Sequence, residues 1–295
     1  MSIPAPHAGV RMMMPIGDGD IATLRFGDNA APPLLFAHAN GFCASAYRQM
    51  LIALGDRFDV FAVDLRGHGR SSLPTSGPPH RGLDLFGADV SRVLDRLISD
   101  GAPNGPWTLA GHSLGAVAVT LAAVGRSDVA GLKLIEPVAI PSSLSMLARS
   151  PLWPALAPRL PLVGLAQSRR AVWPDRAAAK ASYARKPLFA TWAAGVLDDY
   201  LEDGLTDGEG GVRLSCAPAW EAANFAAQAH DFWGALAKAP APVAVLAANH
   251  PSTTVRKGAR ARFRRLGAAV VEIGGSTHLF PFEEPQEAAN FLAAG

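Results

Sequence analysis

The sequence predicts an α/β fold in which a mostly parallel sheet is flanked by helices. Short, continuous apolar runs, typical of strands covered on both faces, alternate with longer segments whose apolar residues recur every three or four positions. Such alternation favours right-handed βαβ crossovers and therefore parallel strands. Polar residues follow several of the apolar runs. In sheets of this kind the ligand site lies beyond the carboxyl ends of the strands, so we expect these polar residues to share one edge.

The first half of the chain supplies most of the predicted strands. Residues 21–26 alternate apolar and polar side chains and stop at a Gly-Asp-Asn turn, which predicts an early edge strand. Continuous apolar runs predict strands at 33–37, 58–63 and 131–135 and another that begins at Trp107. Helices are expected at 44–54, at 83–98, where apolar residues keep a 3.6-residue rhythm, and from Leu114 onward.

The strand and helix alternation stops between residues 138 and 229 and then resumes. Six prolines break up its first part: Pro137, Pro141, Pro151, Pro154, Pro158 and Pro161. We therefore expect a core formed by residues 1–137 and 230–295 with a mainly helical inserted lid over 138–229. Its tryptophans, Trp153, Trp173 and Trp192, are expected either to pack between helices or to line an apolar pocket. In the second part of the core we expect strands at 242–248 and 268–273 and helices at 254–266 and 285–294.

Composition excludes several classes of protein. Of the 295 residues, 49% are hydrophobic and 18% are charged, which excludes a disordered chain. The net charge of +2 indicates neither a nucleic acid nor a membrane partner, and the basic residues of 256–265 are expected on a solvated helix face. Cys43 and Cys216 form no disulfide framework or metal motif, and residues 1–20 lack a signal-peptide pattern. We therefore expect a cytoplasmic protein without a metal site.

The most informative stretch is Gly111-His112-Ser113-Leu114-Gly115, a Gly-x-Ser-x-Gly turn between an apolar run and an Ala/Val-rich run. A strand, a sharp turn and a helix would hold Ser113 at the apex, clear of the sheet. The two glycines leave room for a strained turn and for close packing of helix against strand. The start of the helix would direct backbone N–H groups toward the serine. Ser113 is therefore a candidate nucleophile.

Four motifs in order resemble the α/β-hydrolase fold superfamily: HANGF at 38–42, DLRGHGRSS at 64–72, GHSLG at 111–115 and GGSTHLFPFEEP at 274–285. The resemblance covers nearly the whole chain from residue 21. It implies that Ser113 is the nucleophile, that His278 is the general base, and that no cofactor is needed. The chemistry agrees, because a serine hydroxyl needs a base of near-neutral pKa to become nucleophilic.

The resemblance also implies an oxyanion hole made of two backbone N–H groups. One belongs to Leu114, directly after the nucleophile, and the other lies in the loop after residues 33–37. An ungapped alignment makes Asn40 the second donor, whereas a shifted register makes it Phe42. Asn40 is favoured because Tyr47-Arg48 then falls where relatives often carry an aromatic–Arg pair. The neighbouring residues His38, Phe42 and His112 are expected to contact the substrate.

The chain departs from the family at the third catalytic residue. Most relatives carry the acid just after the strand that follows the lid, but residues 247–254 contain no carboxylate and offer only Asn249. Glu136 is the best substitute, because it ends the strand after the nucleophile helix. Certain haloalkane dehalogenases resemble this arrangement. Asp231 is a weaker candidate, and Asp64 is expected to brace its own loop.

These residues favour a serine hydrolase of small to medium apolar carboxylic esters or lactones. The serine at the elbow disfavours dehalogenase and epoxide hydrolase chemistry, for which similar proteins use an aspartate. C–C bond hydrolysis and perhydrolysis use the same triad and stay open. A receptor-like member with vestigial turnover also stays open, because the usual acid is missing from its loop.

Overall fold

A mixed eight-stranded sheet forms the centre of the computed structural model, which describes residues 9–28, 30–76, 80–103, 105–240 and 242–294. The strand order is β1-β2-β4-β3-β5-β6-β10-β11. Strands β1 and β2 are antiparallel to their neighbours, and every other pair is parallel, which confirms the predicted fold class. The strands are β1 (Val10–Pro15), β2 (Asp20–Phe26), β3 (Pro33–Ala37), β4 (Asp59–Val63), β5 (Trp107–His112), β6 (Val129–Ile135), β10 (Val243–Asn249) and β11 (Ala269–Gly274).

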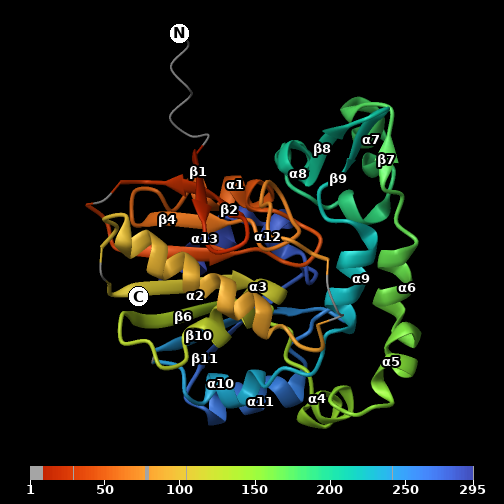
Figure 1. Cartoon of the computed structure of the whole chain (residues 1–295). Coiled ribbons are helices and arrows are strands. Elements are labelled where there is room, and N and C mark those ends of the chain that lie inside the picture. The colour runs from red at the N-terminus through yellow and green to blue at the C-terminus, as the bar shows by residue number, and fades with distance from the viewer. Residues whose placement is uncertain (1–8, 29, 77–79, 104, 241, 295) are drawn as a thin grey trace.

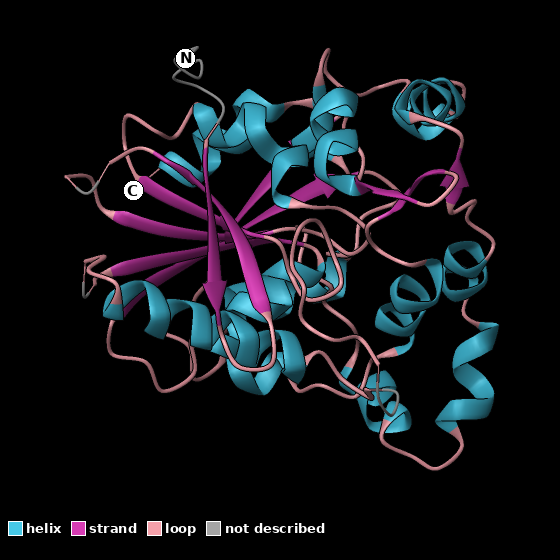
Figure 2. Ribbon diagram, turned by 45° about the horizontal axis from the view of Figure 1, so that its top comes forward, coloured by secondary structure: helices cyan, strands magenta, loops and turns pink. Residues whose placement is uncertain are grey.

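Helices cover both faces of this sheet, as Figures 1 and 2 show. Strand β3 illustrates why, because Leu35 and Ala37 face one apolar cluster while Leu34 and Phe36 face the other. The first face carries α2 (Asp84–Ser99), α3 (Leu114–Ala122), α10 (Phe232–Leu236) and α11 (Lys257–Arg265). The second carries η1 (Ala44–Tyr47), α1 (Arg48–Ile52), α12 (Phe280–Glu283) and α13 (Pro285–Ala293).

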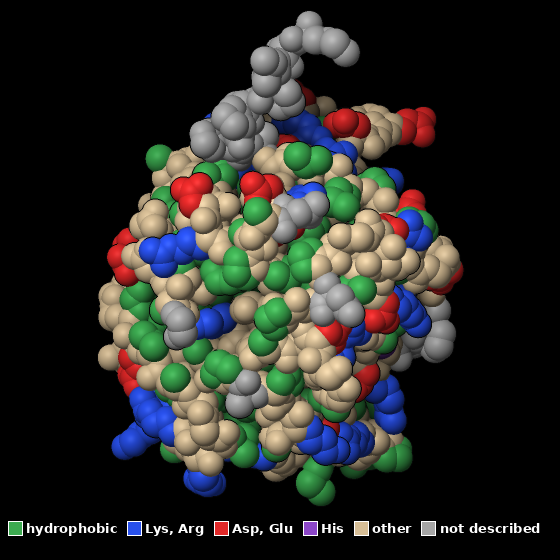
Figure 3. All heavy atoms as spheres, turned by 90° about the vertical axis from the view of Figure 1, so that its left-hand side faces the viewer, with side chains coloured by type: hydrophobic (Ala, Val, Ile, Leu, Met, Phe, Trp, Pro, Cys, Tyr) green, Lys and Arg blue, Asp and Glu red, His purple; other side chains and the backbone are tan. Residues whose placement is uncertain are grey.

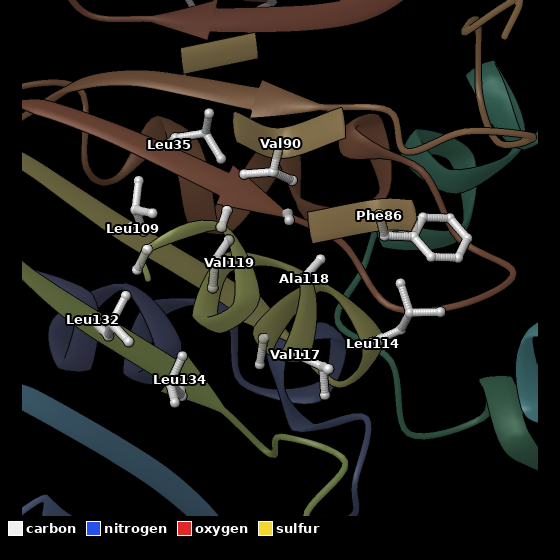
Figure 4. Close-up of a cluster of buried hydrophobic side chains, with 14 of the residues drawn as sticks. Leu35, Phe86, Val90, Leu109, Leu114, Val117, Ala118, Val119, Leu132 and Leu134 are labelled. Atoms are coloured by element: carbon white, nitrogen blue, oxygen red, sulfur yellow. The ribbon is translucent and has the colours of Figure 1, made fainter. Parts of the chain in front are cut away.

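Helix α3 is the most deeply buried of the core helices that frame the site. Figure 4 shows its side chains Val117, Ala118 and Val119 in one apolar cluster with sheet residues such as Leu109 and with Phe86 and Val90 of α2. All of its residues except Leu121 are buried, which explains why its sequence is apolar without a polar stripe. Helix α3, which begins directly after Ser113, is thus held in place by packing around nearly its whole circumference.

The expectation of an edge strand at residues 21–26 is wrong. Strand β1 pairs antiparallel with β2, so β2 lies inside the sheet and is almost fully buried. The edge strand is β1, in which Val10 and Met13 are exposed. Its three consecutive methionines give no alternation of apolar and polar residues, so the sequence carried no strand signal there.

The section inserted between β6 and α10, residues 138–229, packs along one side of the sheet (Figure 1). Its helices are α4 (Ser142–Ala148), α5 (Trp153–Leu156), η2 (Ala157–Arg159), α6 (Pro161–Gln167), α7 (Arg176–Ala184), η3 (Pro187–Phe189), α8 (Val196–Gly204) and α9 (Pro218–Ala226). A small antiparallel sheet joins β7 (Val172–Trp173), β9 (Gly211–Leu214) and β8 (Leu205–Gly208). Trp153 and Trp173 are buried packing residues, whereas Trp192 packs against Phe282.

The surface carries charges of both signs. On the face in Figure 3, acidic and basic side chains lie among apolar and uncharged ones, consistent with the small net charge. The basic run at 256–265 forms α11 and is mostly exposed, although Arg260 binds Glu272 and the Arg262 guanidinium lies 4.3 Å above the Trp233 ring. In the described ranges, no helix combines the length and the apolar character needed to cross a membrane.

Candidate active site

Ser113 occupies the sharp turn between β5 and α3. Its φ of 55° and ψ of −113° lie outside the regions that L-residues normally adopt, a strain of about 1–3 kcal/mol. The flanking glycines make the turn possible. A Cβ on Gly115 would lie 2.1 Å from the Ala37 carbonyl oxygen, and one on Gly111 would lie 2.5 Å from the Gly115 carbonyl carbon. The Gly-x-Ser-x-Gly pattern is thus a steric requirement of this strand–helix contact.

His278 joins Ser113 to Glu136 through its two ring nitrogens. Its Nε2 lies 3.1 Å from Ser113 Oγ, and its Nδ1 lies 2.9 Å from Glu136 Oε2. The N–H of His278 donates to Ser252 Oγ at 2.8 Å, which fixes the loop after β11. The structure therefore brings together three residues that are far apart in the chain and that the sequence had singled out as a nucleophile, a base and an acid.

The Glu136 carboxylate is fully buried at the end of β6 and is surrounded by hydrogen-bond donors. It accepts the Ala248 N–H at 2.7 Å, the Thr253 hydroxyl at 2.7 Å and the Thr254 N–H at 3.0 Å. Burial acts to raise the pKa of Glu136, but the hydrogen bond and charge of His278, together with these donors, outweigh it and lower the pKa below its ordinary value. The loop after β10, which has no carboxylate of its own, thus stabilises the negative charge of Glu136.

The carboxylates of the other two acid candidates bind backbone N–H groups elsewhere in the core. Asp231 caps α10 by accepting the Gly234 N–H at 3.0 Å, and Asp64 accepts the N–H groups of Ala44 and Arg70. Asn249 is exposed at the end of β10. Within the described residues, Glu136 alone of the chain's carboxylates is hydrogen-bonded to His278.

Two backbone N–H groups, one directly after Ser113 and one in the loop after β3, find no acceptor among the described residues. Within the described residues, no hydrogen bond uses the N–H of Asn40 or of Leu114, whereas the Phe42 N–H donates to the Ala39 carbonyl at 3.2 Å. The tight contact of Gly115 with the backbone after β3 brings the loop and the start of α3 together. Asn40 and Leu114 therefore have free donors of the kind that an oxyanion needs, and Phe42 does not.

The expectation that His38 and His112 contact a substrate is wrong, because both are fully buried with both ring nitrogens engaged. His38 Nε2 accepts the Leu65 N–H at 2.9 Å, and its Nδ1 donates to the Ala39 carbonyl at 2.7 Å. His112 accepts from the Tyr47 hydroxyl at 2.7 Å and donates to the His278 carbonyl at 3.0 Å. Burial lowers the pKa of each ring well below its ordinary value, so both stay neutral and position the loops around Ser113.

Phe42 lies in an aromatic cluster at the junction of the core and the inserted section. Its ring centroid is 4.8 Å from that of Phe282, 5.3 Å from Tyr200 and 5.9 Å from Trp192. The cluster joins the loop after β3 to α8 and α12. Phe42 is half-buried, so the expected substrate contact stays a prediction.

Sequence reasoning missed the residues that hold the site in place. Thr253 and Thr254 stood out only as part of a loop without an acid, and Asn224, which binds Asn40, gave no signal. Tyr47 served as an alignment marker, yet its hydroxyl accepts the Ala39 N–H at 3.1 Å and donates to His112. Such contacts join residues distant in sequence, and only the fold shows them.

Known proteins similar in sequence to this chain include an enol-lactonase and a non-heme chloroperoxidase. It is 35% identical over 91 residues to 3-oxoadipate enol-lactonase 2 of Acinetobacter baylyi, a match that covers 28% of this chain and 33% of that protein. It is 27% identical over 209 residues to a non-heme chloroperoxidase of Streptomyces lividans, covering 68% and 70% of the two chains.

Among solved structures, E-2-(acetamidomethylene)succinate hydrolase superposes with a TM-score of 0.75 at 24% identity, over 97% of this chain and 100% of that one. This likeness shows the fold. The chain matches only about a third of the length of the enol-lactonase. The model of the alpha/beta hydrolase family matches residues 34–291, which is most of the chain. The protein therefore belongs to the alpha/beta hydrolase family.

Proposed function

We propose that the protein is a serine hydrolase that cleaves carboxylic esters or lactones through an acyl-enzyme on Ser113. The observation that carries the proposal is the hydrogen-bonded chain from Ser113 Oγ through His278 to Glu136. A hydroxyl, an imidazole and a buried carboxylate in this order form the arrangement that activates serine on several unrelated folds. The strained turn and the two N–H groups without an acceptor among the described residues support the same conclusion.

Each residue has a defined step in the proposed reaction. His278 Nε2 takes the Ser113 proton as Oγ attacks the carbonyl carbon, and the N–H groups of Asn40 and Leu114 bind the oxyanion. The protonated His278 then gives its proton to the leaving oxygen, and a water activated in the same way releases the acyl group. Glu136 holds the imidazole in the required tautomer and stabilises its positive charge, which its lowered pKa allows it to do as a carboxylate.

The inserted section, residues 138–229, is proposed to be the lid over this site and to select small apolar substrates. The Trp192 ring of this section packs at a tilt against Phe42 and Phe282, both of which lie close in sequence to proposed site residues. Packed aromatic rings favour an apolar acyl group. The similarity to an enol-lactonase over part of the chain supports including lactones among the proposed substrates.

A fluorophosphonate probe and a substrate panel test this function. We expect the probe to label Ser113, located by peptide mass spectrometry, and we expect hydrolysis of nitrophenyl butyrate and of neutral and carboxylated lactones. Ser113→Ala should abolish labelling and turnover. An unlabelled serine together with no turnover on the whole panel would exclude the hydrolase and favour a receptor-like protein.

Perhydrolysis is a second candidate, favoured by the similarity to a non-heme chloroperoxidase. In that reaction hydrogen peroxide replaces water as the nucleophile that attacks the acyl-enzyme. Halogenation of monochlorodimedone in acetate buffer with bromide and peroxide would measure the peracid formed. We expect this rate to be lower than that of ester hydrolysis by the same enzyme.

A further inference from the structure

We propose that Asn224, on helix α9 of the inserted section, is a positioning residue that sets the backbone N–H of Asn40 in the oxyanion hole. This inference rests on the proposed function, because it concerns how the same site is assembled. It adds that the hole is completed across the boundary between the core and the inserted section. Helix α9 would then be a working part of the site as well as a cover.

The Asn40 side chain is held mainly by α9, and His68 Nε2 of the core also lies 3.3 Å from its Oδ1. Its Nδ2 donates to the Glu221 carbonyl at 3.0 Å, and its Oδ1 accepts from Asn224 Nδ2 at 2.9 Å. Asn40 is 7% exposed and Asn224 is 2% exposed, so solvent does not compete for either bond. With both ends of its amide fixed, Asn40 cannot rotate about its Cα–Cβ bond without breaking a hydrogen bond in a buried setting.

The next residue, Gly41, also lies against the inserted section. Its N–H donates to His68 Nε2 at 3.0 Å, and its carbonyl accepts the Tyr200 hydroxyl at 3.3 Å. Its φ is 78°, and a Cβ there would lie 2.7 Å from the Glu221 side chain. The two peptide groups that flank Asn40 are thus held by core residues, while the Asn40 side chain and the Gly41 carbonyl meet the inserted section.

The burial of Asn224 needs an explanation, because its neighbours on α9, Ala222, Phe225 and Ala226, are apolar. A primary amide buried without a partner destabilises the fold by about 1–3 kcal/mol, so an apolar residue would be the simpler choice. The amide is useful here because it anchors Asn40. A backbone donor stabilises the oxyanion only when it lies about 2.7–3.1 Å from it, so a small rotation of the Asn40 peptide removes the benefit.

The test compares Asn224→Leu, Asn40→Ala and the double variant on an ester that the wild-type enzyme hydrolyses. Asn40→Ala keeps the backbone N–H and removes only the anchor. We expect kcat to fall by about tenfold to a hundredfold in each single variant. KM should stay within about twofold. The double variant should be no slower than the slower single variant, because both changes break one connection.

A trifluoromethyl ketone inhibitor supplies the second measurement, because its adduct with serine carries the same oxyanion. Its affinity should fall by the same factor as kcat/KM, which a purely structural defect in substrate binding would not produce. Gln228→Ala is the matched control. Gln228 is also buried and donates to Phe225 at the end of α9, but it does not contact Asn40, so its variant should keep the wild-type kcat.

An unchanged kcat in Asn224→Leu, or a rise in KM alone, would overturn the inference while leaving the serine hydrolase in place. If Asn224→Leu fails to fold by circular dichroism, Asn40→Ala decides, and an unchanged kcat there overturns the inference equally. A wild-type enzyme without turnover or labelling would instead refute the proposed function itself.

Discussion

Glu136 contacts both His278 and the loop after β10, so substitutions at this residue test the third member of the site most directly. It has a φ of 45°, which non-glycine residues rarely adopt, and its N–H is bonded to the Leu246 carbonyl at 2.8 Å. Its backbone is therefore held by the sheet while its carboxylate is held by the loop. This double attachment explains how a residue outside the usual loop reaches His278.

Glu136→Gln should lower kcat by about 10³- to 10⁴-fold with a small change in KM. The amide has nearly the same shape but cannot stabilise the imidazolium, and it can also hold His278 in the wrong tautomer. Steady-state kinetics on the best ester of the panel would measure this. Asp231→Asn is the control, because asparagine also caps a helix well and Asp231 lies outside the site. Equal activity in the two variants would show that Glu136 is not the acid.

Thr253→Val should raise the pKa of Glu136 and make the stability of the fold depend less on pH between 7 and 4. The folded-state pKa of Glu136 is lowered, so its ionised form contributes stability above the unfolded-state pKa, and this contribution is lost as the pH falls through the folded-state pKa. Removing one donor at 2.7 Å should cost about 1–3 kcal/mol at pH 7 and less at pH 4. Urea unfolding at both pH values would measure it. A loss independent of pH would contradict the expectation.

The sequence predicted the meeting of Ser113, His278 and Glu136 because each signal is local. A strained turn needs its two glycines, and the absence of a carboxylate in residues 247–254 directs attention to the neighbouring strand end. The supporting contacts are different. Asn40 and Asn224 lie 184 residues apart, and neither position has a pattern that requires the other. His38 and His112 were misread because a polar residue in a site motif looks the same whether it faces a substrate or a loop.

At the level of elements, α3 and β3 are the pair on which the site depends. Gly115 lies where the helix touches the backbone after the strand, and the predicted Cβ contact is with main-chain atoms, which cannot move aside as a flexible side chain can. The same contact brings the Asn40 loop to the start of α3. The fit between these two elements therefore determines both stability and the geometry of the oxyanion site.

Gly115→Ala should destabilise the protein by about 3 kcal/mol or more and abolish activity. Gly258→Ala is the matched control, because Gly258 also lies in a helix, α11, and a Cβ there would meet nothing within 4 Å. That change should stabilise the fold by about 0.5–1 kcal/mol, since alanine is the better helix former. Thermal melts of the two variants would compare them. Similar melting temperatures would show that the contact is not tight.

Strands that are buried on both faces could be predicted from their apolar runs. Strands that form only because they pair with another strand could not. The continuous apolar runs at β3, β4 and β6 correspond to strands covered on both faces. Strand β1 was missed because it is an exposed edge with no alternating pattern, and its pairing moved β2 into the sheet. The three-stranded sheet of the inserted section joins strands of two to four residues, which are too short to leave a clear alternating pattern in the sequence.

At the scale of the whole molecule, ion pairs connect the inserted section to the core, two of them on the buried carboxylate of Asp203. Asp203 on α8 is 1% exposed and accepts from Arg70 at 2.8 Å and from Arg11 on β1 at 2.5 Å. Arg48 on α1 binds Asp199 at 2.7 Å. Because these pairs join α8 to β1, α1 and the loop after β4, α8 and the core should move as one body, whereas the outer helices of the inserted section should move more freely.

Arg70→Met should loosen this connection. It leaves Asp203 buried with Arg11 as its remaining partner, so the cost should lie between the about 0–1 kcal/mol of an exposed pair and the about 3–5 kcal/mol of a fully buried one. We expect faster hydrogen exchange in α8 and in the loop after β4, with the central strands β3 and β5 unchanged. Lys180→Met is the control, because its pair with Asp198 is about half exposed on both sides and worth about 0–1 kcal/mol. Exchange mass spectrometry would separate the two cases, since equal protection in both variants would mean that packing alone holds the inserted section against the core.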